Sequence, residues 1–125
     1  MKILVVDDEV DVRAFFEQRF RKEIRNNEMV FVFAHSGQEA LDYLSGLNRE
    51  SILILSDINM PGMSGLDLLK HIKDEYSKPP PVVMMISAFG DDENYSRAMS
   101  LGADDFLTKP LNFNHLKEKL NTASC

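Results

Sequence analysis

Five short apolar runs alternate along the chain with longer segments whose apolar residues recur at helical spacing. The first four runs are continuously apolar, which is typical of strands that are covered on both faces of a sheet. The last run is the least apolar, and we therefore expect it at an edge of the sheet. The five predicted strands are residues 2–6, 29–34, 52–56, 82–86 and 104–108.

The segments between these runs carry the signals of amphipathic helices. Over about 10–25, apolar residues recur every four positions, which predicts the buried stripe of one helix. Ser36 and Glu39 have the spacing of a capping box at the start of a second helix. Gly102 is placed to end the fourth helix in a left-handed conformation, and Asn112 is placed to cap the fifth.

Strands that alternate with helices predict a single α/β domain, in which a parallel sheet carries helices on both faces. Right-handed crossovers limit the topology to a few arrangements. The flavodoxin-like order 2-1-3-4-5 suits five such units and makes the first and third strands neighbours. Periodicity alone leaves the order open.

Composition agrees with one soluble domain, because 44% of the 125 residues are apolar and 27% are charged. No apolar run approaches the roughly 20 residues that span a bilayer, and no secretory signal is recognisable. The single cysteine is Cys125, which leaves no internal disulfide or cysteine-based metal site. These features favour a reducing cytoplasm. The net charge of −6 argues against direct nucleic-acid binding.

Polar side chains follow four of the predicted strands, at the edge where the carboxyl ends of parallel strands meet. These residues are Asp7 and Asp8, Asp57, Ser87 and Lys109. Three crowded carboxylates repel one another unless a cation lies between them, and an all-oxygen site suits Mg²⁺ best. Each residue alone would more often be a turn residue, a helix cap or a surface lysine. Their joint placement favours a phosphoryl-accepting site with Asp57 as the nucleophile.

Four segments carry the chemistry and its surroundings: 3–9, 56–65, 86–88 and 102–110. With these segments the chain resembles the receiver domains of two-component response regulators, and it is similar to chemotaxis-type single-domain regulators. The resemblance extends over about 3–120. It implies a flavodoxin-like (βα)5 three-layer sandwich with a five-stranded parallel sheet in the order 2-1-3-4-5.

The resemblance also implies the phosphorylation site and its metal. Asp57 matches the aspartate that accepts the phosphoryl group. Asp7 and Asp8 match the acid pair that holds Mg²⁺ with it, with Mn²⁺ as the alternative ion. Asn59 matches the position whose backbone carbonyl completes the set of protein ligands.

Three further positions match residues that bind the phosphoryl group or change conformation in response to it. Ser87 matches the switch hydroxyl, and Lys109 matches the lysine that pairs with another phosphoryl oxygen. The bond between Lys109 and Pro110 is usually cis in this family. Phe106 stands where Tyr is common and matches the aromatic switch residue that turns inward when Ser87 moves. This movement would remodel the face formed by the fourth helix, fifth strand and fifth helix.

The resemblance implies a signalling domain that catalyses only its own phosphorylation and dephosphorylation. Its phosphodonor would be a sensor histidine kinase, a phosphotransfer protein or a small phosphodonor. Its output would be an unknown partner or a C-terminal effector domain, and the switch face could also form a homodimer. We expect the receiver domain over 1–121 and a C-terminal tail over 122–125, without contact to a membrane.

Three other functions compete with this interpretation. A degenerate receiver that only binds proteins would not need the complete set of acids, hydroxyl and lysine. Phosphatases of the haloacid dehalogenase type resemble one another in carrying the motif Asp-x-Asp, with the nucleophile, after their first strand. In this chain two adjacent acids end the first strand, and the lone Asp57 follows the third. A flavin-binding module would need a loop rich in Ser, Thr and Gly in place of Asp7, Asp8 and Glu9.

Overall fold

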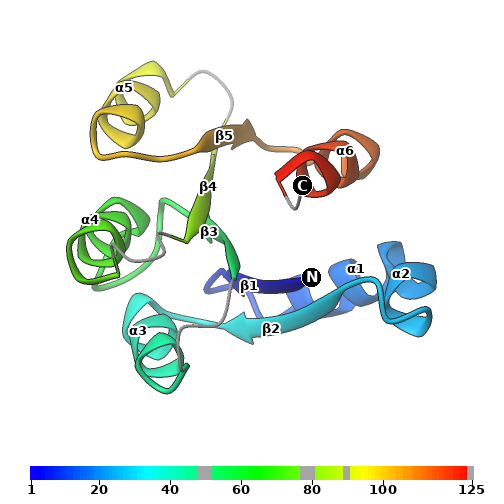
Figure 1. Ribbon diagram of the computed structural model, residues 1–125. Coiled ribbons are helices and arrows are strands. Elements are labelled where there is room, and N and C mark those ends of the chain that lie inside the picture. Colours follow the sequence, from blue (N-terminus) through cyan, green and yellow to red (C-terminus); the bar gives the residue numbers. More distant parts are fainter. Residues whose placement is uncertain (48–51, 77–80, 89–90, 124–125) are drawn as a thin grey trace.

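The computed structural model describes residues 1–47, 52–76, 81–88 and 91–123 of the chain. Five strands form its centre: β1 (Lys2–Val6), β2 (Val30–Ala34), β3 (Leu53–Asp57), β4 (Val82–Ser87) and β5 (Asp105–Thr108). All neighbouring strands are parallel, and their order is β2-β1-β3-β4-β5 (Figure 1). The flavodoxin-like fold and its strand order are therefore confirmed. The weak fifth strand lies at an edge of the sheet, as the sequence predicts.

Helices cover both faces of the sheet and complete the three layers (Figure 1). Figure 1 shows α3, α4 and α5 on one side and α1, α2 and α6 on the other. Their bounds are α1 (Val12–Arg19), α2 (Arg21–Arg25), α3 (Gly37–Ser45), α4 (Gly65–Glu75), α5 (Asp92–Ser100) and α6 (Phe113–Ala123). Because the first predicted helix is divided into α1 and α2, the fourth and fifth predicted helices are α5 and α6.

The unbroken apolar runs are explained by two separate hydrophobic cores. On β1, Leu4 and Val6 pack into the core beneath α3, α4 and α5. Ile3 and Val5, which alternate with them, pack into the core beneath α1 and α6. Successive side chains of a strand point to opposite faces, so a strand with a core on each face needs apolar residues throughout.

Two predictions about local structure were wrong. The run 29–34 was expected to be a buried strand, but β2 is an edge strand with only β1 beside it, and Val30 is 49% exposed. The helix expected over 10–25 is broken at Phe20, where φ is −110° and ψ is 23°. A four-residue repeat is longer than a helical turn, so its stripe rotates by about 40° per repeat around a straight helix. The break at Phe20 accommodates this drift while its ring stays buried.

The predicted helix caps at Ser36 and Asn112 and the predicted helix end at Gly102 are present in the structure. The Ser36 hydroxyl accepts the N–H of Glu39, and Asn112 accepts an N–H of α6 in the same way. The Glu39 carboxylate accepts the N–H of His35 at 2.8 Å and not that of the cap itself, so the predicted capping box is half formed. Gly102 has a positive φ of 98°, which ends the segment after α5 in the left-handed region.

The N-terminus of α4 packs on the main chain at the end of β3. Ser64 caps the helix, and the Gly65 N–H donates to the carbonyl of Ile58 at 2.8 Å. A Cβ atom on Gly65 would overlap the carbonyl oxygen of Asp57 and would lie 2.7 Å from the Cα of Ile58. Both obstacles are main-chain atoms, so they cannot move aside as a flexible side chain would. Gly65 thus allows α4 to support Asp57 directly.

We predict that Gly65→Ala lowers the free energy of unfolding by about 3 kcal/mol, because overpacking here must displace the main chain. Gly46→Ala is the matched control, since a Cβ there would meet only the Tyr43 carbonyl, at 3.6 Å. We expect the control to change stability by less than about 0.5 kcal/mol. Urea denaturation measures both values, and equal stability of the two variants would contradict the prediction.

Candidate functional site

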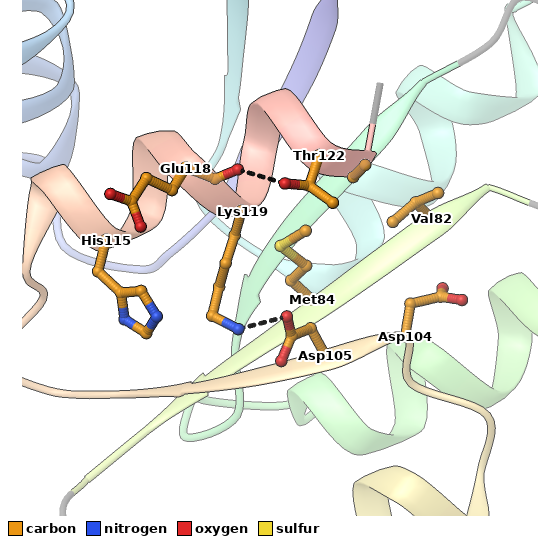
Figure 2. Close-up of a pocket in the computed structure, with 9 residues that line it drawn as sticks. Val82, Met84, Asp104, Asp105, His115, Glu118, Lys119 and Thr122 are labelled. Atoms are coloured by element: carbon orange, nitrogen blue, oxygen red, sulfur yellow. Dashed lines mark hydrogen bonds and ion pairs between the residues drawn. The ribbon is translucent and has the colours of Figure 1, made fainter. Parts of the chain in front are cut away.

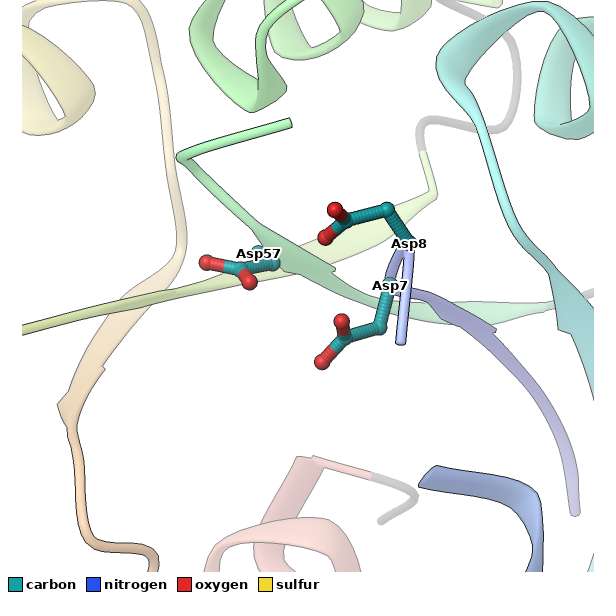
Figure 3. Close-up of side chains that lie close together, drawn as sticks. All are labelled: Asp7, Asp8 and Asp57. Carbon is teal, nitrogen blue, oxygen red and sulfur yellow. The ribbon is translucent and has the colours of Figure 1, made fainter. Parts of the chain in front are cut away.

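Three carboxylates converge at the carboxyl edge of the sheet. Asp7 and Asp8 follow β1, Asp57 ends β3, and the pairing of these two strands brings the acids together. Figure 3 shows the three side chains gathered beyond the strand ends. One oxygen of each carboxylate lies within 4.8 Å of the others. Asp57 is 4% exposed and Asp7 is 7% exposed, whereas Asp8 faces solvent.

The crowding changes the protonation of the acids. Burial raises the pKa of the Asp7 carboxyl, and the charge of Asp57 raises it further. The Glu9 N–H, which donates to the Asp7 carboxylate at 2.9 Å, acts against this rise without cancelling it. Asp7 therefore binds a proton more readily in the folded protein than in the unfolded chain.

Lys109 supplies the positive charge of the site. Its Nζ lies 3.0 Å from an Asp57 carboxylate oxygen. Burial lowers the pKa of Lys109, but the hydrogen bond and charge of Asp57, together with the charges of Asp7 and Glu9, outweigh burial and raise it. The Lys109 N–H donates to the carbonyl of Ser87 at 2.8 Å, which ties β5 to β4 at this edge. The peptide bond to Pro110 is cis, as the resemblance implies.

Comparison with known proteins identifies the family of the chain. Residues 3–121 match the response regulator receiver domain family. The chain belongs to this family. It is 34% identical to the response regulator RppA of Synechocystis over 88% of this chain and 44% of that protein. A receiver domain protein from Clostridium thermocellum has a TM-score of 0.83 and 31% identity, over 98% of this chain and 92% of that one.

One related structure is a complex. The receiver domain of the Saccharomyces cerevisiae response regulator Ssk1, crystallised with the histidine phosphotransfer signalling protein Ypd1, has a TM-score of 0.81 and 26% identity to this chain. The match covers 95% of this chain and 85% of that one. The chain spans about half or less of the length of the curated relatives that it matches. In the part of the chain that the structure describes, no helix is long and apolar enough to cross a membrane.

Of the other predicted residues, Asn59 lies close to the acid cluster and Phe106 packs elsewhere. The Asn59 N–H lies 3.4 Å from an Asp57 carboxylate oxygen, so its main chain reaches the acid cluster. The predicted role of its carbonyl stays a prediction. Phe106 lies on β5, half-buried, and its ring packs edge-on against Tyr95 of α5 with centroids 5.1 Å apart. Phe106 therefore belongs to the α5 side of the domain and has no direct contact with the acid cluster among the interactions described.

Ser87 is fully buried at the end of β4, and its hydroxyl has a partner outside the cluster of Asp7, Asp8 and Asp57. It donates to the Asp91 carboxylate at 3.0 Å. The sequence analysis did not indicate this contact between Ser87 and Asp91. The sequence feature that could have indicated the contact is the position of Asp91, a polar residue four positions after Ser87.

His35 is a second residue that the sequence did not indicate. Its Nδ1 lies 3.0 Å from the carbonyl oxygen of Asp7, and because a carbonyl only accepts, Nδ1 carries the proton. His35 follows β2 at the same edge of the sheet. The strand-end argument used for the other residues, applied to β2, would have found it.

A pocket of about 490 Å³ lies away from the acid cluster, near the start of β4 and β5, and is lined along one side by α6. Figure 2 shows Lys119 and Asp105 pointing toward one another across it, and their ion pair measures 2.7 Å. Nearby, Lys73 pairs with Asp104 at 3.0 Å. These charges neutralise one another in pairs, unlike the acids at the carboxyl edge. The uncompensated negative charge therefore lies at the acid cluster, where, among the described residues, Lys109 pairs with Asp57 alone.

We predict that Asp7→Asn raises the free energy of unfolding of the metal-free domain near neutral pH, on the order of 1 kcal/mol, the scale of one close charge repulsion in water. The raised pKa means that ionised Asp7 destabilises the fold at pH values above its folded-state pKa. The difference should vanish below the ordinary pKa of 3.8, where Asp7 is protonated in both the folded and unfolded states.

Urea denaturation over a pH series measures this difference. Asp74→Asn, at an exposed position on α4, is the control for the same change in net charge. Mg²⁺ should stabilise the unmodified domain more than it stabilises Asp7→Asn. A less stable Asp7→Asn at neutral pH without metal would contradict the expected sign.

Proposed function

We propose that this receiver domain accepts a phosphoryl group on Asp57. The observation that supports this proposal is the convergence of three carboxylates and the Lys109 ammonium group at one edge of the sheet. An Asp57 oxygen attacks the phosphorus atom in line, a P–O bond forms, and the bond from phosphorus to the donor breaks. When the donor is a phosphohistidine, the imidazole leaves and the product is an acyl phosphate. Water later hydrolyses the acyl phosphate and restores the carboxylate.

The acid cluster fits a hard divalent cation. Asp7, Asp8 and Asp57 offer only oxygen ligands, and these lie close together. These residues, with the Asn59 carbonyl, would hold Mg²⁺ or alternatively Mn²⁺. The bound ion would neutralise the acids and the phosphoryl oxygens.

Lys109 and Ser87 would bind oxygen atoms of the phosphoryl group. Lys109 stays charged, because the acids raise its pKa, and its Nζ is already 3.0 Å from Asp57. It thereby stabilises negative charge on a phosphoryl oxygen, which is the main demand of phosphoryl transfer. Ser87 would donate its hydroxyl to another phosphoryl oxygen.

The signal leaves through the packing around Phe106. When the Ser87 hydroxyl moves toward the phosphoryl group, Phe106 turns inward and its contact with Tyr95 changes. This remodels the face of α5, β5 and α6, which binds an output partner, acts on a C-terminal effector domain or forms a homodimer. The domain thus switches a partner and does not process other substrates.

A groove of about 600 Å³ beside the acids suits the phosphodonor protein. Asp7, Lys109 and Phe15 are among the residues that line it, and Phe15 is 57% exposed. A phosphohistidine that reaches Asp57 must approach this edge of the sheet. The related Ssk1 receiver domain was crystallised with a histidine phosphotransfer protein. We therefore expect a sensor histidine kinase or a phosphotransfer protein here.

The remaining assignments follow from the same proposal. We take the receiver unit as residues 1–121 and residues 122–125 as a C-terminal tail whose first two residues extend α6. The domain works in the cytoplasm, where its kinase presents the phosphoryl group. Its net charge of −6 disfavours direct contact with nucleic acid.

Incubation with phosphoramidate or acetyl phosphate and Mg²⁺ is expected to add the mass of one phosphoryl group to the intact protein. Asp57→Ala should add none, because it removes the nucleophile, and Asp74→Ala should behave as the unmodified domain. Intact-mass spectrometry measures the uptake. A protein that gains no mass would be a receiver that only binds partners, and steady turnover of phosphomonoesters would indicate a phosphatase.

Lys109→Gln is expected to slow phosphoryl uptake by about 100-fold, the usual effect of removing one donor that stabilises the transition state. Lys70→Gln, an exposed lysine on α4, is the matched control and should keep the normal rate. The rate is followed by intact mass over time at fixed phosphoramidate. An unchanged rate in Lys109→Gln would remove Lys109 from the proposed chemistry.

A further inference from the structure

The Ser87 hydroxyl is held by a partner outside the acid cluster. Ser87 is 0% exposed, and its Oγ donates to an Asp91 carboxylate oxygen at 3.0 Å. The same Asp91 oxygen accepts the Asn94 side-chain amide, while the other oxygen accepts the Asn94 main-chain N–H at 3.3 Å. Asp91 therefore caps α5 and binds the switch hydroxyl at the same time.

This contact competes with phosphoryl binding. A serine hydroxyl carries one proton and donates it to one acceptor at a time. Hydrogen bonds to a carboxylate are stronger than those between neutral groups. The Asn94 side chain lowers the pKa of Asp91, and the Ser87 hydroxyl lowers it further, so Asp91 remains a charged acceptor. Ser87 must leave this acceptor before it can donate to a phosphoryl oxygen on Asp57.

We propose that Asp91 is a positioning residue that retains Ser87 in the resting arrangement and sets how readily the domain enters its phosphorylated conformation. This inference rests on the proposed phosphorylation of Asp57. Ser87 and Phe106 would promote the conformational change, whereas Asp91 would oppose it.

The same residue connects Ser87 to the aromatic pair. The Asp91 carbonyl accepts the Tyr95 N–H at 3.1 Å in the first turn of α5. The Tyr95 ring meets the Phe106 ring edge-on, at an interplanar angle of 86°. Loss of the contact between Ser87 and Asp91 frees the start of α5 on the side that carries Tyr95. Release of one hydroxyl is thereby transmitted to Phe106 through a single helical turn.

The test is the affinity of the domain for beryllofluoride in the presence of Mg²⁺, which mimics the phosphoryl group on Asp57. Asp91→Ser keeps a good helix cap but is too short to retain the Ser87 hydroxyl. We expect it to bind beryllofluoride about tenfold more tightly, because the competing charged hydrogen bond is absent. Amide NMR spectra recorded during the titration give the affinity and report the environment of Asn94.

Three variants show whether the effect passes through Ser87. Asp92→Ser removes the same charge from the next position of the helix and should leave the affinity unchanged. In a Ser87→Ala background, Asp91→Ser should have no effect, because no hydroxyl is left to release. Asp91→Asn keeps the shape and the cap, and it should show a smaller increase in the same direction, which also serves if Asp91→Ser does not fold.

Each outcome decides the inference. An affinity within twofold of the unmodified domain, a lower affinity, or an increase that persists with Ser87→Ala would overturn the role of Asp91. Failure of the unmodified domain to take up a phosphoryl group from phosphoramidate would instead overturn the proposed function. The two failures are therefore distinguishable in the same set of samples.

Discussion

Repulsion among Asp7, Asp8 and Asp57 is the constraint on which the rest of the structure depends. Nothing in a carboxylate cluster favours folding, so the two hydrophobic cores on either face of the sheet must hold the acids together. Buried and close to Asp57, Asp7 binds a proton more readily than in the unfolded chain, and Lys109 compensates only one of the acids directly. The site thus carries uncompensated negative charge, which a divalent cation would neutralise.

The sequence was most informative where one local rule decides the structure. Unbroken apolar runs located the strands, and the strand-end rule placed Asp57 and Lys109 at one edge, because parallel strands all end on the same side. Burial of β2 was mispredicted, since exposure of a strand depends on how many neighbours the sheet gives it. The break at Phe20 was missed because a four-residue repeat looks helical until its drift around the axis is counted.

Side-chain partners were the least predictable part of the site. The partner of Glu39 is the N–H of His35, one residue before the expected one, and the partner of Ser87 is Asp91. In both contacts the partners are four positions apart, so the choice depends on how the chain turns from the end of a strand into the next helix. Glu39 and Ser87 were recognised from the sequence, whereas His35 and Asp91 were not recognised as their partners, so the sequence showed one member of each pair without its partner.

The contact between Lys109 and Asp57 joins residues 52 positions apart, and it forms only when β5 has joined β4 at the far side of the sheet. Contacts between distant parts of the chain slow folding, and this one cannot form before Lys109 has been synthesised. During synthesis, Asp57 leaves the ribosome well before the lysine that pairs with it. A nascent chain would thus carry its acceptor aspartate without a competent site, and signalling capacity would appear in one step when the last strand is added.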